Sequence, residues 1–236
     1  MNGQWSPITG ISSMATRQIL ADLADAYAVR SGRQVVIESV GGVAAAKRIL
    51  DGEAFDIVVL ASNAIDTLAC AKRVDDSSRV NIARSGVAVA IATGAQQPSI
   101  ETEADVREAV LNARSIGYST GPSGVYLMDL FQRWGIADAI ASRIIQAPPG
   151  VAVGSLIARG EVALGFQQMS ELIGVDGIDI LGPLPRSIQT LTVFQGAVCS
   201  NAHVPQDDAR ALLSFMASAD VDAVRRQNGM QRLDEA

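Results

Sequence analysis

The chain has 236 residues and a formal net charge of −6, and 48% of its residues are hydrophobic while only 4% are aromatic. This length fits one large domain or two small ones, with a core built from small aliphatic side chains. No run of Lys or Arg exceeds two residues, so the basic stripe expected of a nucleic-acid-binding protein is absent. No apolar run is long enough to span a bilayer, so we expect no membrane insertion.

Residues 1–7 contain neither the basic segment nor the apolar segment of a secretory signal peptide. We therefore expect a cytoplasmic protein from the sequence as it stands, or a periplasmic one if a leader was removed. The two cysteines, Cys70 and Cys199, lie far apart and match no metal-ligand spacing, which favours small buried side chains. No cluster of His, Cys and carboxylate residues predicts a metal site, and no motif predicts a cofactor.

The first third of the chain alternates between short apolar strands and helices. Leu20, Leu23 and Tyr27 repeat at helical spacing, whereas residues 55–60 form a short run rich in β-branched side chains, as in a buried parallel strand. The expected elements are strands at 8–11, 34–40 and 55–60 and helices at 14–29, 43–50 and 62–71.

The rest of the chain continues this alternation. Pro122 suits the first turn of a helix, because its missing N–H would have no partner there. Pro183 and Pro185 mark a rigid connection that cannot donate to a strand ladder. The expected strands are 86–92, 116–118, 143–146, 162–166, 178–181 and 191–198, and the expected helices are 103–113, 122–134, 136–142, 151–159, 169–173, one beginning near 205, and 220–227.

The order of strands and helices predicts the architecture. Alternation at this spacing indicates βαβ units and parallel sheets. Two long apolar strands, 86–92 and 191–198, bracket the middle third of the chain, as expected if each passes between two lobes. We therefore predict an α/β protein with two Rossmann-like lobes, central mixed sheets, two crossover strands and a ligand cleft between the lobes. Lobe 1 comprises residues 1–85 and 197–236, and lobe 2 comprises residues 86–196.

The loops that follow the predicted strands are rich in small and hydroxyl-bearing residues. In parallel sheets the carboxyl ends of the strands meet at one edge, where ligands bind. Residues 119–124 open a helix, so their hydroxyls and backbone N–H groups can face an anion. The candidate ligand-binding residues are Ser12, Ser13, Gly41, Gly42 and Ser62 in lobe 1 and Ser119, Thr120, Ser123, Val151, Gln167 and Gln168 in lobe 2.

Three segments resemble the molybdate-binding proteins, which are type II periplasmic solute-binding proteins with two α/β lobes. Residues 52–61 match a Gly-x-x-x-Asp-apolar-apolar-apolar-x-Ala pattern of that group, residues 122–126 resemble its Pro-Ala-Gly-x-Tyr loop, and residues 151–166 resemble a later helix and strand. The similarity runs from about residue 8 to residue 229. It implies the two-lobed fold, a small anionic ligand and, for an exported protein, an ABC transporter permease as partner.

The resemblance also implies roles for individual residues. Ser13 matches a serine whose hydroxyl holds the oxyanion, and Ser123 and Val151 match positions that act through backbone N–H groups. Gly42 stands where a second serine is expected, and Gln168 stands where a tyrosine is expected. The missing hydroxyl opens space, and amides both donate and accept hydrogen bonds. These two departures favour a larger, planar carboxylate over a compact tetrahedral oxyanion.

An isomerase is the alternative function, because aconitate isomerase, which shifts a proton on di- and tricarboxylates, is similar to molybdate-binding proteins. Such an enzyme needs a base, an acid and groups that hold the carboxylates. Glu38 and Tyr118 are the candidate bases. Arg17 and Arg84 are candidate carboxylate clamps, with a solvated surface position as the alternative for each. His203, the only histidine, lies in a polar linker, so Ser–His catalysis is not expected.

Overall fold

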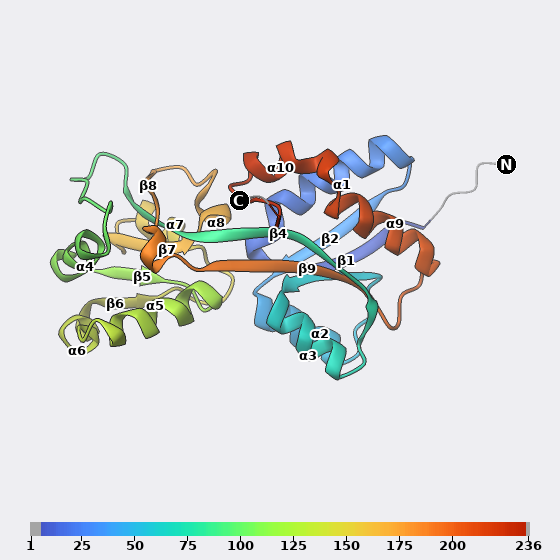
Figure 1. Ribbon diagram of the computed structural model, residues 1–236, viewed down its shortest axis with the longest axis horizontal. Helices are drawn as coiled ribbons and strands as arrows, with labels where there is room; N and C mark the ends of the chain where they lie inside the picture. Colours follow the sequence, from blue (N-terminus) through green and yellow to red (C-terminus); the bar gives the residue numbers. More distant parts are fainter. Residues whose placement is uncertain (1–5, 235–236) are drawn as a thin grey trace. The chain divides into compact units, whose positions relative to one another are not determined.

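The computed structural model describes residues 6–234, which divide into two compact units. Unit 1 takes the chain up to Arg84 and from Val193 onward, and unit 2 is the continuous segment Ser85–Thr192. The chain passes from unit 1 to unit 2 within β4 (Val74–Ala92) and returns within β9 (Leu191–Cys199), as Figure 1 shows. The predicted mixed α/β class is confirmed.

Unit 1 contains a mixed sheet with strand order β2-β1-β3-β9. β1 runs parallel to β2 and β3, and β9 runs antiparallel to β3. The other elements are β1 (Ile8–Ser13), β2 (Val35–Val40), β3 (Ile57–Ala61), α1 (Arg17–Ser31), α2 (Gly42–Leu50), α3 (Ser62–Cys70), α9 (Gln206–Ala217), α10 (Asp222–Gln227) and the 3-10 turns η1 (Met14–Thr16) and η4 (Ala219–Val221).

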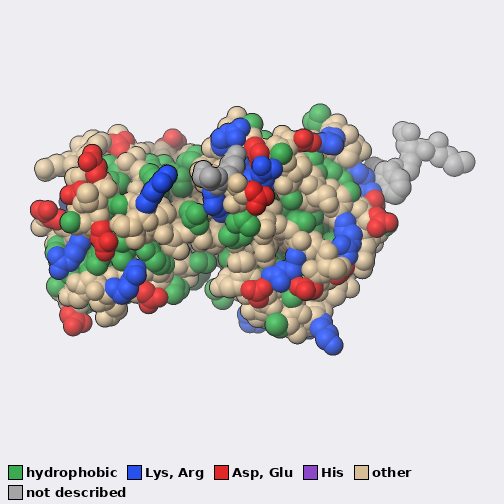
Figure 2. Space-filling model, in the orientation of Figure 1, with side chains coloured by type: hydrophobic (Ala, Val, Ile, Leu, Met, Phe, Trp, Pro, Cys, Tyr) green, Lys and Arg blue, Asp and Glu red, His purple; other side chains and the backbone are tan. Residues whose placement is uncertain are grey.

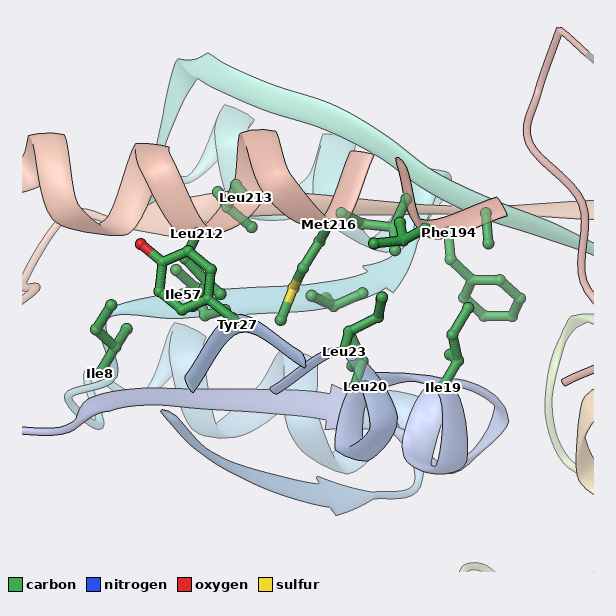
Figure 3. Packing of buried hydrophobic residues seen from close by; sticks show 14 of the residues in the cluster. Ile8, Ile19, Leu20, Leu23, Tyr27, Ile57, Phe194, Leu212, Leu213 and Met216 are labelled. Carbon is green, nitrogen blue, oxygen red and sulfur yellow. The ribbon is translucent and has the colours of Figure 1, made fainter. Parts of the chain in front are cut away.

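Two apolar cores stabilise unit 1. The first contains Leu20 and Leu23 of α1, Leu212 and Met216 of α9, and Phe194 of β9, and Figure 3 shows these side chains gathered between the helices and the sheet. The second lies under α2 and α3. Each fully buried aliphatic or aromatic side chain contributes about 1.5–3 kcal/mol. The cores fix the strands in register, so that the carboxyl ends of β1, β2 and β3 lie at one edge.

A buried carboxylate at the start of β3 joins three parts of unit 1. Asp56 accepts hydrogen bonds from Thr9 N (2.7 Å), Thr9 Oγ1 (2.9 Å), His203 N (2.7 Å) and Val204 N (3.0 Å). Burial acts to raise the pKa of Asp56, but these hydrogen bonds outweigh it and hold the pKa below its ordinary value. The aspartate of the 52–61 pattern therefore has a structural role, in which it holds β3 to β1 and to the segment before α9.

Unit 2 contains a second mixed sheet with strand order β4-β7-β5-β6, and β8 pairs with β4. β5 runs parallel to β6 and β7, whereas β4 runs antiparallel to β7 and β8. The remaining elements are β5 (Ile116–Tyr118), β6 (Ile144–Gln146), β7 (Leu164–Gln168), β8 (Ile178–Pro183), α4 (Glu103–Asn112), α5 (Pro122–Arg133), α6 (Ala137–Ile140), α7 (Val153–Ala158), α8 (Met169–Leu172) and the 3-10 turns η2 (Ala141–Arg143) and η3 (Arg186–Ile188).

Unit 2 also has two apolar cores. The larger includes Phe131 of α5 and Phe166 of β7, whose rings meet edge to face with their centroids 6.3 Å apart. The smaller packs α7 and α8 against β7. A Cβ on Gly165 would lie 2.5 Å from Ile157 Cδ1, so the glycine allows α7 to approach β7 closely. This packing sets the N-terminus of α7 against the carboxyl end of β7.

Several elements differ in their bounds from the sequence expectation, β4 and the first helix among them. β4 begins at Val74, well before the predicted residue 86. The sequence did not predict this first part because residues 75–79 are all polar and no continuous apolar run precedes residue 86. The predicted helix at 14–29 begins with the 3-10 turn η1, and α1 proper begins at Arg17.

The surface of the described residues is mixed in charge. On the face drawn in Figure 2, acidic and basic side chains are interspersed over both units. Within residues 6–234, no helix combines the length and the apolar character needed to cross a membrane.

Candidate functional site

A group of hydroxyls lies at the carboxyl end of β1 in unit 1. Ser12 Oγ lies 2.8 Å from Ser39 Oγ of β2, and the strand register pairs these two residues. Ser13 Oγ lies 3.4 Å from Thr16 Oγ1, and the Thr16 hydroxyl donates to Ser13 O (3.0 Å). Ser12, Ser13 and Thr16 are buried. The Thr16 proton is engaged by Ser13 O, so the serine hydroxyls of this group are the ones that can donate to an anion without adding charge.

Two helix N-termini adjoin these hydroxyls. Gly41 is the N-cap of α2, and a Cβ on Gly42 would lie 3.5 Å from Ser13 Cβ, so α2 begins directly beside Ser13. Ser62 is the first residue of α3 and follows β3 at the same sheet edge. No described side chain caps the N-terminus of α2, so its first-turn N–H groups can donate to an anion. In the first turn of α3, the Asn63 side chain accepts a hydrogen bond from Ala64 N (3.0 Å).

In unit 2, the loop after β5 is a tight turn of small residues. Ser119 Oγ lies 3.1 Å from Ser123 Oγ and accepts a hydrogen bond from Gly121 N (3.4 Å). A Cβ on Gly124 would lie 1.7 Å from Ser119 O, so the close approach of loop and helix requires glycine. Ser123 is buried, whereas Thr120 is exposed. The turn brings two hydroxyls to the N-terminus of α5.

The N-terminus of α7 is held by a buried amide. Gln167 Oε1 accepts a hydrogen bond from Val153 N (2.7 Å), and Gln167 is 1% exposed. Val151 N donates to Pro148 O (3.0 Å), which closes the turn before α7. Gln167 thus supports this turn, and the Val151 N–H is engaged within it.

Gln168 is also engaged by the protein. Its side chain is buried, and the amide orientation that satisfies both ends has Oε1 accepting from Thr192 Oγ1 (2.6 Å). In that orientation Nε2 donates to Ser85 O (3.0 Å) and Gly86 O (3.3 Å). These partners are the residues at which the chain enters and leaves unit 2. The Gln168 amide therefore joins β7 to both connecting strands.

The two candidate bases lie in different surroundings. Glu38 is exposed, and its two carboxylate oxygens accept from Arg48 Nη1 and Nη2 at 2.6 and 2.9 Å. The hydrogen bonds from Arg48 lower the pKa of Glu38, with desolvation opposing them, so the carboxylate is a weakened proton acceptor. Tyr118 packs against the larger core of unit 2, and its ring lies 2.9 Å from the position of a Cβ on Gly124. It therefore borders the 119–124 loop.

The other charged candidates are dispersed. Arg17 is exposed at the start of α1. Arg84 lies on β4, and its backbone exchanges two hydrogen bonds with Gln231 (2.8 and 3.0 Å). His203 holds Asp56 through its backbone N–H. Of these, Arg17 directly follows Thr16, which belongs to the cluster of hydroxyls at the carboxyl end of β1.

Glu171 is not among the residues predicted from the sequence. It lies in α8, directly after the β7 edge that carries Gln167 and Gln168. Burial raises the pKa of Glu171 to about 7, and a hydrogen bond from Gln167 opposes this only in part. The sequence feature that could have pointed to Glu171 is its place just beyond the predicted ligand residues Gln167 and Gln168. Its burial comes from packing between elements, which a polar residue in a short helix does not reveal.

Other features of the described residues lie outside these loops. Among residues 6–234, no group of His, Cys, Asp and Glu could hold a metal ion. A cavity of about 620 Å³ in unit 2 is lined by Asp105, Glu108, Arg114 and the chain entering β7. It lies at the amino ends of β5 and β7, opposite the 119–124 loop, and none of the predicted site residues lines it.

The fold is that of the type II periplasmic binding proteins. The structure of the Azotobacter vinelandii periplasmic molybdate-binding protein matches with a TM-score of 0.79 at 20% identity, over 94% of this chain and 98% of that one. Peb3 from Campylobacter jejuni matches with a TM-score of 0.72 at 13% identity, over 95% and 99% of the two chains. At these identities the likeness establishes the fold.

The chain belongs to the family of bacterial extracellular solute-binding proteins, which matches it over residues 8–231. An aconitate isomerase from Pseudomonas sp is 34% identical over 232 residues, which are 95% of this chain and 87% of that protein. The predicted resemblance to molybdate-binding proteins and aconitate-isomerase-like members is confirmed.

Proposed function

We propose that the chain binds a small anion, a di- or tricarboxylate, at the loops that follow its parallel strands. The observation that carries this proposal is that hydroxyls and uncapped helix N-termini gather at the ligand edge of each sheet. In unit 1 these are Ser12 and Ser13 with α2, and in unit 2 they are Ser119 and Ser123 with α5. Hydrogen bonds from such donors to an ionised ligand are short and strong. Membership of a solute-binding family supports ligand binding.

The space beside Ser13 favours a carboxylate over a tetrahedral oxyanion. Gly42 provides no hydroxyl, and a Cβ at this position would meet only Ser13 Cβ, at 3.5 Å. The relative named aconitate isomerase supports a tricarboxylate as the ligand class. In a transport role, a periplasmic form of the chain would deliver this ligand to an ABC transporter permease.

A second candidate function is the isomerisation of a small unsaturated carboxylic acid. It is supported by the 34% identity to an aconitate isomerase over most of both chains and by Glu171, whose pKa desolvation raises to about 7. In such a reaction a base removes a proton from a carbon beside a carboxylate, the double bond shifts, and an acid returns a proton to the far carbon. The reaction moves one proton and one double bond, so a base and an acid are the groups that it needs.

A ligand screen tests the binding proposal. Thermal unfolding is followed with cis-aconitate, trans-aconitate, citrate, molybdate and tungstate. A ligand at a hundred times its Kd stabilises the folded state by about 2.7 kcal/mol, which raises the Tm by roughly 5–10 °C for a chain of this size. We expect this shift with a carboxylate. A shift with molybdate or tungstate alone would contradict the proposed ligand class.

Proton NMR in D₂O separates binding from turnover. Trans-aconitate is incubated with the protein, and its spectrum is followed for deuterium uptake and for new signals. Deuterium uptake or a new isomer establishes the isomerase, whereas an unchanged ligand that raises the Tm establishes binding alone.

A further inference from the structure

The cavity at the amino ends of β5 and β7 lies within unit 2 and away from the loops of the proposed anion site. Its volume is about 620 Å³, which is typical of small-molecule sites of about 300–1,000 Å³. One wall is α4, and another is the segment that follows β4. The buried side chains Ile91, Val162 and Leu164 form its apolar floor. The cavity therefore has room for a ligand with several carbon atoms.

Hydrogen bonds hold the walls of this cavity in place. At the start of α4, Thr102 N donates to Asp105 Oδ2 (2.9 Å) and Asp105 N donates to Thr102 Oγ1 (3.2 Å), which is a capping box. The chain that enters β7 is held by Ser115, whose Oγ accepts from Ala163 N (2.9 Å) and whose O accepts from Leu164 N (3.1 Å). The cavity is therefore preformed, as small-molecule sites usually are.

The helix α4 presents a row of polar side chains to the cavity. Asp105, Glu108 and Asn112 are spaced by three and four residues, so they share one face of the helix, and all three line the cavity. Asp105 Oδ2 accepts two hydrogen bonds from Thr102, at 2.9 and 2.8 Å. Glu108 makes no hydrogen bond or ion pair with any of the described residues. Glu108 is therefore the carboxylate that is available to a ligand.

The cation of the cavity is Arg114, just beyond the end of α4. It is the one Lys or Arg among the described residues that line the cavity, and within residues 6–234 it makes no ion pair, with Glu108 or with any other acid. At 1.5 Å per residue, Glu108 and Asn112 are about 6 Å apart along the helix, and Arg114 follows Asn112 in the chain. Two opposite charges thus line one cavity without neutralising each other.

We propose that this cavity binds an ω-amino acid, a zwitterion in which a hydrocarbon chain separates the ammonium group from the carboxylate. Glu108 accepts hydrogen bonds from the ammonium group, the Arg114 guanidinium donates to the carboxylate, and the chain packs on the apolar floor. A simple anion would face the carboxylates of Asp105 and Glu108, and a simple cation would face Arg114. A zwitterion satisfies both ends. The site is separate from the proposed anion site and does not rest on it.

NMR titration of the ¹⁵N-labelled protein with 6-aminohexanoate tests the site. We expect the amide signals of Ala163 and Leu164 to shift, with a Kd of about a millimolar for a ligand of this size. Hexanoate and hexylamine keep the chain but carry one charge each, so they should bind about tenfold more weakly or worse. Equal binding of either one would overturn the zwitterion as the ligand class. Absence of any shift with 6-aminohexanoate well above this Kd would overturn the site.

Two variants test the assigned contacts. Glu108→Gln and Arg114→Gln each remove one charge at an exposed position, so both should fold normally and bind 6-aminohexanoate about tenfold more weakly. Glu108→Gln should also bind hexanoate more tightly than the wild type does, because a repulsive charge is gone. Glu101→Gln and Arg107→Gln change exposed charges that do not line the cavity, and they are the matched controls. Unchanged affinity in both cavity variants would overturn the proposal.

Competition with trans-aconitate keeps this site distinct from the proposed anion site. The cavity lies at the amino end of β5, whereas the 119–124 loop follows its carboxyl end. We expect 6-aminohexanoate to bind equally well with and without trans-aconitate. Displacement by trans-aconitate would place the zwitterion at the loops and overturn the proposal. If trans-aconitate does not bind at all, the proposed function fails alone, and the shifts of Ala163 and Leu164 still decide whether the cavity is occupied.

Discussion

The pKa values of Asp56 and Glu171 are shifted in opposite directions, because hydrogen bonds outweigh desolvation at Asp56 whereas desolvation dominates at Glu171. Asp56 receives backbone and hydroxyl donors from two segments, and its pKa lies below the ordinary value of 3.8. Its contribution to stability is present above that value and is lost as the pH falls through the folded-state pKa. The pKa of Glu171 is raised from 4.5 to about 7 by burial. Its contribution is present below 4.5 and is lost as the pH rises through about 7.

At the residue scale, Gly42 is the position that should set ligand class. In Gly42→Ser the added Cβ fits, because the nearest atom is Ser13 Cβ at 3.5 Å. The new hydroxyl fills the space proposed for a planar carboxylate and adds a donor for a compact oxyanion. One added hydrogen bond of about 0.5–1.5 kcal/mol raises molybdate affinity roughly two- to twelvefold. We expect this gain together with weaker trans-aconitate binding.

Calorimetric titration of both ligands measures the change in selectivity. Gly41→Ala is the control for added bulk, since a Cβ at Gly41 meets no atom within 4 Å. An unchanged ratio of the two affinities in Gly42→Ser would place the ligand away from α2.

At the scale of elements, the alternation of strands and helices was sufficient to predict the α/β class and most of the elements. It was insufficient for the first part of β4, where Asp75, Asp76 and Arg79 interrupt the apolar pattern. Those side chains make ion pairs on the surface of unit 1, which no local pattern reveals. The strand is held there by pairing and packing with distant parts of the chain.

In the candidate loops too, the positions of residues along the chain were predictable, whereas their distant hydrogen-bond partners were not. Parallel strand ends placed Ser12, Ser13, Gly41 and Gly42 at one edge, and the structure brings them together. The role of Ser39 depends on strand register, and the internal bonds of Gln167 and Gln168 depend on partners far along the chain. Such partners follow from tertiary packing and could not be derived from spacing alone.

The turn between β5 and α5 depends on the glycine at position 124, and a substitution there tests this. Gly124→Ala would place a Cβ 1.7 Å from Ser119 O, so the loop must move away from the helix. We expect the free energy of unfolding to fall by about 1–3 kcal/mol, and ligand affinity to be lost because Ser119 and Ser123 separate. Denaturant unfolding and calorimetric titration measure the two effects.

Gly121→Ala is the matched control for this loop. Its Cβ would lie 3.6 Å from Ser119 Oγ, which is an ordinary contact, so stability and affinity should change little. Equal effects of the two substitutions would show that the close approach at Gly124 is not what shapes the loop.

At the scale of the whole molecule, unit 2 is inserted into the chain of unit 1. The connecting strands leave unit 1 after Arg84 and return to it at Val193. Gln168 contacts both connections from within unit 2, through Thr192 on one strand and through Ser85 and Gly86 on the other. One buried amide therefore forms hydrogen bonds with both ends of the inserted segment.

Gln168→Leu tests whether these hydrogen bonds stabilise the protein. The substitution leaves the Thr192 hydroxyl and the Ser85 and Gly86 carbonyls without their amide partner. We expect the free energy of unfolding to fall by about 1–3 kcal/mol, as measured by denaturant unfolding. Gln146→Leu, at an exposed position on β6, is the control. If both variants are as stable as the wild type, the amide does not stabilise the connections.

The position of β9 has a consequence for protein synthesis. β3 pairs with residues 194–198 of β9, which follow all of unit 2 in the chain. At about 5–20 residues per second, the ribosome adds the partner of β3 on the order of ten seconds after β3 itself. Unit 2 is continuous in the chain and can fold during that interval. The edge of the apolar strand β3 that later pairs with β9 is unpaired during the same time. We therefore expect the nascent chain to be most prone to aggregation before residues 194–198 emerge and pair with β3.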